Sequence, residues 1–203
     1  MTVTLHKNDL PADLSFKESV AIDTEAMGLK TERDRLCLVQ LSSGDGTAHL
    51  IQFDKGCYDA PNLKKLLLDE NVTKLFHFAR FDVAILKAYL GVECTPIYCT
   101  KIASRLCRTY TDRHGLKDLT RHLLDVNLDK QQQTSDWGAE ILTEEQITYA
   151  ASDVLYLHAL REKLDEILER EGRTLLFERV CEALKVRAAL DLEGWGDTDI
   201  FAH

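Results

Sequence analysis

Three strand-like runs lie close together near the start of the chain, and they constrain its fold more than any other feature. The runs Val20–Glu25, Leu36–Leu41 and Ala48–Phe53 are rich in apolar and β-branched residues. A Ser-Gly-Asp-Gly segment at 43–46 separates the second run from the third, and such a turn predicts a β-hairpin. We therefore expect an antiparallel meander at the beginning of a sheet.

The rest of the chain alternates helical patterns with short strand patterns. Helical periodicity begins at Pro61 and recurs over Asp82–Tyr89, Lys101–Cys107 and Leu116–Leu124, whereas Lys74–Phe78 and Pro96–Cys99 have the pattern of strands. A polar stretch at 125–138 is expected to be a connecting loop. A meander followed by this alternation predicts an α/β fold, a mixed sheet with at least one parallel crossover, flanked by helices.

The C-terminal third has helical patterns only. A capping-box sequence at Thr143 predicts the start of a helix that runs to about Glu171. A last helix is expected over Thr174–Leu190, followed by a loose tail.

Composition narrows the class of protein. Lys and Arg number 25 against 34 Asp and Glu, a net charge of −9, which argues against a broad basic surface for polyanions. At 203 residues the chain can bury one core, so we expect one domain over 1–203. The six cysteines lack C-x-x-C and zinc-site spacing, which predicts reduced, mostly buried thiols. Without a signal-type start or an apolar run of membrane length, we expect a cytoplasmic protein that binds no membrane.

The first strand pattern ends in two acids. Asp23 and Glu25 are two residues apart, so both side chains leave the same face of a strand and can converge on one cation. Most acid-x-acid pairs lie on a solvated surface. This pair differs because it ends an apolar run, where a partly buried carboxylate needs a cation.

Two further acids stand at predicted helix positions. Tyr149 and Asp153 are four apart and share one helix face, with small residues between them. Asp82 begins a helix directly after a strand. Each has a simple structural alternative, a tyrosine that covers the core and an acid that complements the helix dipole.

Taken together, these residues resemble the tyrosine branch of the DEDD superfamily of 3′-5′ exonucleases. Its three motifs are matched in order by AIDTEAMGL at 21–29, HFARFD at 77–82 and YAASD at 149–153. The segment KQQQTSDWG at 130–138 is similar to a Lys/Gln/Ser-Asp-Trp stretch of ribonuclease D. The resemblance covers about residues 15–170.

The resemblance implies a ribonuclease H-like core and a two-metal site. Its two ions, Mg²⁺ or Mn²⁺, would be held by the four acids Asp23, Glu25, Asp82 and Asp153. Tyr149 would place the attacking water. An apolar wedge and a stacking surface for the terminal base are expected from the flanking residues, with core packing as the alternative: Met27, Gly28, Leu29, His77, Phe78 and Phe81. The family often has Asn where this chain has Phe78.

Charge and length bear on the substrate. Ribonuclease D continues after its nuclease core into helical nucleic-acid-binding domains, whereas here only a short segment follows, and the chain is acidic. We therefore expect very short RNA, because phosphate contacts accumulate with length. A basic turn between two helices supplies candidates to cap a 5′ phosphate, with a solvated loop as the alternative: Arg108, Arg113, His114 and Lys117.

Among stand-alone enzymes of the branch, the chain resembles nanoRNase C of alphaproteobacteria. That resemblance implies hydrolysis of diribonucleotides to mononucleotides and a ring-like homo-octamer, with the helix and tail at 172–203 as expected interface. Two alternatives stay open. One is a general 3′-5′ exonuclease on longer RNA or DNA, since four acids do not themselves recognise the 2′-hydroxyl. The other is a catalytically silent nucleic-acid-binding domain of the same fold.

Overall fold

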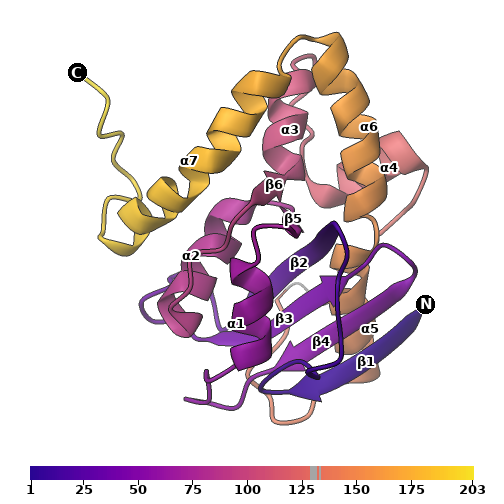
Figure 1. The fold of residues 1–203 in the computed structure, drawn as a ribbon, viewed down its shortest axis with the longest axis vertical. Helices are drawn as coiled ribbons and strands as arrows, with labels where there is room; N and C mark the ends of the chain where they lie inside the picture. The colour runs from indigo at the N-terminus through magenta and orange to yellow at the C-terminus, as the bar shows by residue number, and fades with distance from the viewer. Residues whose placement is uncertain (129–131, 133) are drawn as a thin grey trace.

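The computed structural model describes residues 1–128, 132 and 134–203, and its centre is one mixed β-sheet (Figure 1). Part of the 130–138 motif thus lies outside the described residues. Within the described ranges the sheet has six strands in the order β1-β4-β3-β2-β5-β6. These are β1 (Thr2–Lys7), β2 (Ser19–Ala26), β3 (Leu36–Ser42), β4 (Thr47–Gln52), β5 (Thr73–Phe76) and β6 (Ile97–Cys99). The expected meander β2-β3-β4 is antiparallel, whereas β1 on β4 and the series β2-β5-β6 are parallel.

Helices cover both faces of the sheet. In Figure 1, α1 and α2 lie in front of the sheet and α5 crosses behind it, while the remaining helices gather beyond β6. Their bounds are α1 (Pro61–Leu68), α2 (Ala79–Leu90), α3 (Thr100–Cys107), α4 (Leu116–Leu124), α5 (Glu144–Leu155), α6 (Leu157–Arg170) and α7 (Thr174–Leu192). The α/β architecture with a mixed sheet flanked by helices is therefore confirmed.

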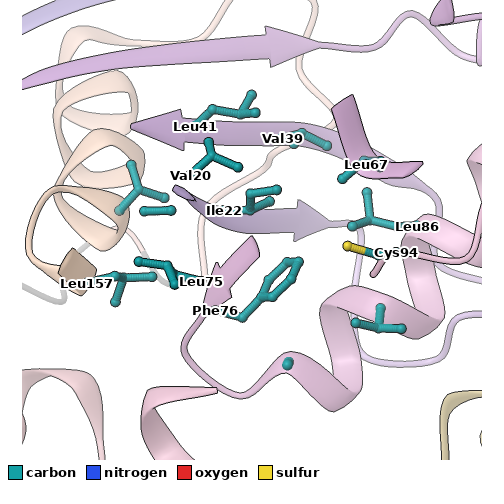
Figure 2. Close-up of a cluster of buried hydrophobic side chains, with 14 of the residues drawn as sticks. Val20, Ile22, Val39, Leu41, Leu67, Leu75, Phe76, Leu86, Cys94 and Leu157 are labelled. Carbon is teal, nitrogen blue, oxygen red and sulfur yellow. The ribbon is translucent and has the colours of Figure 1, made fainter. Parts of the chain in front are cut away.

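The main core lies between the sheet and the helices in front of it. Figure 2 shows Val20, Ile22, Val39 and Leu41 of the central strands beside Leu67 of α1 and Leu86 of α2, and all of these side chains are fully buried. Side chains of a strand alternate between its two faces. Because Val20 and Ile22 of β2 point toward α1 and α2 (Figure 2), the odd-numbered residues of β2 point toward α5. The packing of the core thus fixes the direction in which the acids of β2 point.

Three sequence predictions are corrected by the structure. Strand β1 was not expected, because its alternating polar residues pair only with β4 at the edge of the sheet and carry little apolar signal. The helix predicted from 143 to 171 is broken at Tyr156, which joins α5 to α6. The apolar periodicity continues across the break because both segments bury one face, α5 on the sheet and α6 on α3 and α4. Helix α2 also begins at Ala79, earlier than expected.

The cysteine prediction is confirmed. All six are free thiols, and of these Cys57 alone is exposed. Among the described residues, we find no helix with the length and apolarity needed to cross a membrane.

Candidate active site

Three of the predicted acids meet where β2 faces α5. Carboxylate oxygens of Asp23, Glu25 and Asp153 lie within 4.8 Å of one another. The approach is close because the residues of α5 next to the sheet are small, and Ala150 and Ala151 are fully buried. A complete capping box between Thr143 and Gln146 fixes the start of α5. The local sequence of α5 therefore brings Asp153 to the end of β2.

The fourth acid reaches the cluster from the other side of β2. Asp82 lies in the first turn of α2, is 3% exposed, and accepts a 2.7 Å hydrogen bond from Thr24 Oγ1. Thr24 stands between Asp23 and Glu25, so its side chain points to the opposite face of the strand. The end of β2 thus carries Asp23 and Glu25 on one face and, through Thr24, binds Asp82 on the other. The pairing register of β2 with β3 shifts at this point, between Glu25 and Ala26.

The crowding of these carboxyl groups raises their pKa values. Burial, followed by the charges of Asp153 and Asp82, raises the pKa of Glu25 to about 9. Burial also raises the pKa of Asp82 to about 7, against the lowering effect of the Thr24 hydroxyl. The pKa of Asp23 is raised by burial and then by the charge of Asp82. Without a cation, the cluster therefore retains protons at neutral pH.

Tyr149 lies one turn before Asp153, and its ring packs against Trp137 of the Ser-Asp-Trp element. Its ring lies 6.0 Å from that of Trp137, and Gln146 Nε2 donates hydrogen bonds to Ser135 Oγ (2.8 Å) and the Asp136 carbonyl (3.0 Å). The Ser-Asp-Trp element is therefore fastened to α5. Burial, and then the charge of Asp153, raises the pKa of Tyr149 well above its ordinary value, so its phenol stays neutral.

A cavity of about 640 Å³ opens over the acids. It is lined by all the residues expected at the terminal base, namely Met27, Gly28, Leu29, His77, Phe78 and Phe81. Met27 and Leu29 are largely exposed, at 51% and 86%, which does not fit the alternative of core packing. Glycine at 28 lets the backbone pass close to Asp34, since a Cβ there would come within 2.3 Å of Asp34 Oδ2 unless that side chain moved.

Phe78 has an unusual backbone. Its φ of 77° lies in the left-handed region, which costs a non-glycine residue on the order of 1–3 kcal/mol and which Asn tolerates better. Lys101 Nζ lies 4.3 Å from the centre of the Phe78 ring. The conformation holds a half-exposed aromatic ring at the cavity rather than in the core.

Three of the four expected phosphate-cap residues are not among the described residues that line the cavity. Arg108 is 2% exposed, and its guanidinium donates to Ser104 Oγ and to the Arg113 carbonyl. His114 Nδ1 lies 2.8 Å from the same Ser104 hydroxyl. Arg108 and His114 thus hydrogen-bond within the turn between α3 and α4, and a phosphate-capping role for Arg108, Arg113 and His114 stays a prediction. Lys117 does line the cavity.

Sequence reasoning missed three residues that support the site. Lys101 lines the cavity, and Thr24 positions Asp82. Gln40 is fully buried, stands opposite Asp23 in the β2-β3 register, and its Nε2 lies 3.4 Å from Asp23 Oδ2. A glutamine inside an otherwise apolar strand pattern was the available signal for Gln40. Lys101 had no signal beyond its charge.

Comparison with known proteins identifies the family. A 3′-5′ exonuclease family model matches residues 6–169. Ribonuclease D of Gluconacetobacter diazotrophicus is 38% identical over 154 residues, which cover 76% of this chain. The chain belongs to the 3′-5′ exonuclease family. It spans only about two-fifths of the length of the ribonuclease D proteins that it matches, 39% in this case.

Solved structures give matches over the full length. Brucella melitensis NrnC with bound Mg²⁺ is 54% identical with a TM-score of 0.96, and the match covers 100% of both chains. The same protein bound to pGG is 55% identical with a TM-score of 0.97 and covers 100% of this chain and 99% of that one. The resemblance to ribonuclease D and nanoRNase C is thereby confirmed.

The raised pKa of Glu25 predicts how pH affects the metal-free protein. Because its pKa of about 9 in the folded chain exceeds the ordinary 4.5, the folded state binds more protons, and stability falls as pH rises between these values. The side chain introduced by Glu25→Gln cannot ionise. At pH 8 the free energy of unfolding of this variant should therefore exceed that of the wild type by more than about 1.4 kcal/mol, the equivalent of one pKa unit.

Thermal or urea unfolding in EDTA, at pH 4 and pH 8, measures this difference. At pH 4 the two proteins should be nearly equal. Glu166→Gln changes an acid whose side chain is 68% exposed and serves as the matched control. Equal stabilities of wild type and Glu25→Gln at pH 8 would show that Glu25 is not held in a crowded cluster.

Proposed function

We propose that this protein is a metal-dependent 3′-5′ exoribonuclease that hydrolyses very short RNA, chiefly diribonucleotides, to mononucleotides. The observation that carries the proposal is the meeting of Asp23, Glu25 and Asp153 beside Asp82 in an open cavity. Similarity to NrnC, which has been solved with Mg²⁺ and with pGG, a 5′-phosphorylated dinucleotide by its formula, supports the choice of metal and substrate.

The acids fit a divalent cation. Their donors are all oxygens, as Mg²⁺ and Mn²⁺ prefer, and the raised pKa values of Asp23, Glu25 and Asp82 reflect burial and mutual repulsion that a cation would relieve. Asp23, Glu25, Asp82 and Asp153 would hold two ions. When bound, such ions activate a water and stabilise the leaving 3′ oxygen of an in-line displacement.

The chain's own residues position the reacting groups. Tyr149, as a neutral phenol, orients the attacking water and does not serve as a strong base. Its ring is kept in place by Trp137 and by the hydrogen bonds of Gln146. Thr24 holds the carboxylate of Asp82 in the same way from the other face of β2.

The rim of the cavity would bind the nucleotides. Met27 and Leu29 form the wedge against the 3′-terminal base, and the aromatic side chains at 77, 78 and 81 supply stacking surface. Among the described residues, Lys101 and Lys117 line the cavity as cations, and we propose that they bind phosphate. The overall charge of −9 disfavours longer RNA beyond this cavity.

We propose that the chain is a single exonuclease domain that works in the cytoplasm as a homo-oligomer, with an octamer as the expected assembly. Several large apolar side chains of α7 and the tail are exposed and need cover: Leu175, Leu176, Val186, Trp195 and Phe201. These exposed side chains support the proposal that the contact surface between copies lies within residues 172–203.

Two alternatives remain distinct. A general 3′-5′ exonuclease on longer RNA or DNA is favoured by the ribonuclease D relatives. A catalytically silent nucleic-acid-binding domain is disfavoured by the presence of all four acids and the tyrosine.

Removing one acid tests the metal site. Asp23→Ala or Asp153→Asn should lower Mg²⁺-dependent hydrolysis of a 5′-labelled diribonucleotide at least about a thousandfold, roughly 4 kcal/mol of transition-state stabilisation. Circular dichroism should report an intact fold, and Glu166→Gln should retain full activity. Wild-type turnover by either variant at saturating Mg²⁺ is incompatible with the assignment.

Tyr149→Phe tests the placing of the water. The ring that packs against Trp137 is kept and the hydroxyl is lost, so kcat should fall about 10²-fold or more while KM changes less than twofold. Steady-state kinetics on the diribonucleotide separates the two constants. An unchanged kcat would remove Tyr149 from the mechanism.

Substrate length separates the proposal from its alternatives. In Ca²⁺, which should fill the site without supporting turnover, a 5′-phosphorylated diribonucleotide should bind more tightly than a heptamer, because a terminal phosphate offers contacts that an internal one lacks. Lys117→Ala should weaken dinucleotide binding about tenfold, and Lys185→Ala, far along α7, should not. Affinity that rises steadily from dimer to heptamer would indicate a general exonuclease, and tight binding without any Mg²⁺-dependent cleavage would indicate a silent domain.

A further inference from the structure

The first turn of α2 carries Asp82, and this helix begins without a side-chain cap. The boundary residue is Phe78 in the left-handed conformation, and its side chain makes no capping hydrogen bond. Thr24 fastens Asp82 itself on the inner side of the turn. The outer side of the same turn presents Arg80.

Arg80 is bound by the far end of the chain. Its Nε and one terminal nitrogen donate to the two oxygens of Asp191 at 2.6 and 2.8 Å, a bidentate pair. The same terminal nitrogen donates to the Gly196 carbonyl at 2.8 Å. Asp191 lies at the C-terminal end of α7, which Figure 1 shows beside α2. Two elements more than a hundred residues apart in sequence are thus joined at the turn that carries Asp82.

The carboxylate of Asp191 is itself fixed. Arg187, one turn earlier on α7, donates to Asp191 Oδ1 and also to the carbonyls of Trp195 and Gly196. The Asp191 side chain is only 16% exposed, so this network differs from the exposed ion pairs that contribute little. Both arginines therefore converge on one carboxylate and one carbonyl.

The turn that ends α7 positions the Gly196 carbonyl. Gly194 has a φ of 86°, its N–H donates to the Asp191 carbonyl, and the Trp195 N–H donates to the Leu190 carbonyl at 2.8 Å. These are the two hydrogen bonds of a Schellman motif, which requires the left-handed conformation that glycine adopts freely. The turn reverses the chain and aims the Gly196 carbonyl at Arg80.

We infer that Arg80 and Asp191 form a clamp that positions Asp82, so the end of α7 tunes the affinity of the acidic cluster for divalent cations. This inference rests on the proposed role of Asp82 as a metal ligand. Arg80 is a positioning residue, two positions from Asp82 in one helical turn, and it touches neither metal nor substrate. Metal sites need their ligands held within about 0.5 Å, which a first turn without a side-chain cap does not provide alone.

Metal titrations test the clamp. Arg80→Ala and Asp191→Ala should each raise the Mg²⁺ concentration for half-maximal hydrolysis about fivefold to tenfold, with KM for the diribonucleotide changed less than twofold. The Ca²⁺ concentration for half-maximal thermal stabilisation, a readout that needs no catalysis, should rise equally. The double variant should be no worse than either single one, because both remove the same interaction.

Arg80→Lys and Asp191→Asn keep the shape of the site and serve where an alanine variant fails to fold. Arg80→Lys keeps the charge but loses the bidentate geometry, so it should also weaken metal binding. Glu182→Ala, which removes an exposed ion pair on α7, is the control and should leave both midpoints unchanged.

The outcomes separate the two proposals. Wild-type metal midpoints in the clamp variants, with only a lower melting temperature, would show that the clamp merely anchors the tail, and additive effects would likewise overturn it. If wild type and the Glu182→Ala control respond to neither Mg²⁺ nor Ca²⁺, the proposed function itself fails.

Discussion

Repulsion between buried carboxylates at the end of β2 is the constraint on which the rest of the site depends. Three acids from two elements share a space of a few ångströms, and burial strengthens their interaction. A fold keeps such an arrangement only when its framework is rigid and a cation or protons balance the charge. The sheet core in front of β2 and the small residues of α5 supply that rigidity.

Among the residues that the structure describes, neutral hydrogen-bonding side chains support two of the acids and Tyr149. Thr24 donates to Asp82, Gln40 Nε2 lies beside Asp23, and Gln146 holds the segment that packs on Tyr149. Neutral donors orient a carboxylate without neutralising it, so the cluster keeps its demand for a divalent ion. The cationic side chains Lys101 and Lys117 lie at the cavity instead, where phosphate would need them.

The sequence predicted most of the fold because the strands of the meander are apolar and their turn is distinctive. It predicted the acids because their order and spacing along the chain match the three motifs of the family, although each acid alone has an ordinary structural alternative. It did not predict β1, whose pairing depends on a distant strand, or the break at Tyr156, which leaves the periodicity intact. Nor did it predict that the Arg108 guanidinium donates to Ser104 and to the Arg113 carbonyl within a turn, because tertiary packing decides these contacts.

Proton release on metal binding tests whether the crowded acids are protonated without a metal and bind a divalent cation. At pH 7 a group with a pKa of about 9, such as Glu25, still holds its proton, so a divalent ion must displace it. Calorimetric titration of the metal-free protein with Mg²⁺, in buffers of different ionisation enthalpy, counts the protons released. We expect the release of about one proton or more per chain at pH 7, and of fewer protons as the pH approaches 9. Binding without proton release at pH 7, or no binding, would contradict it.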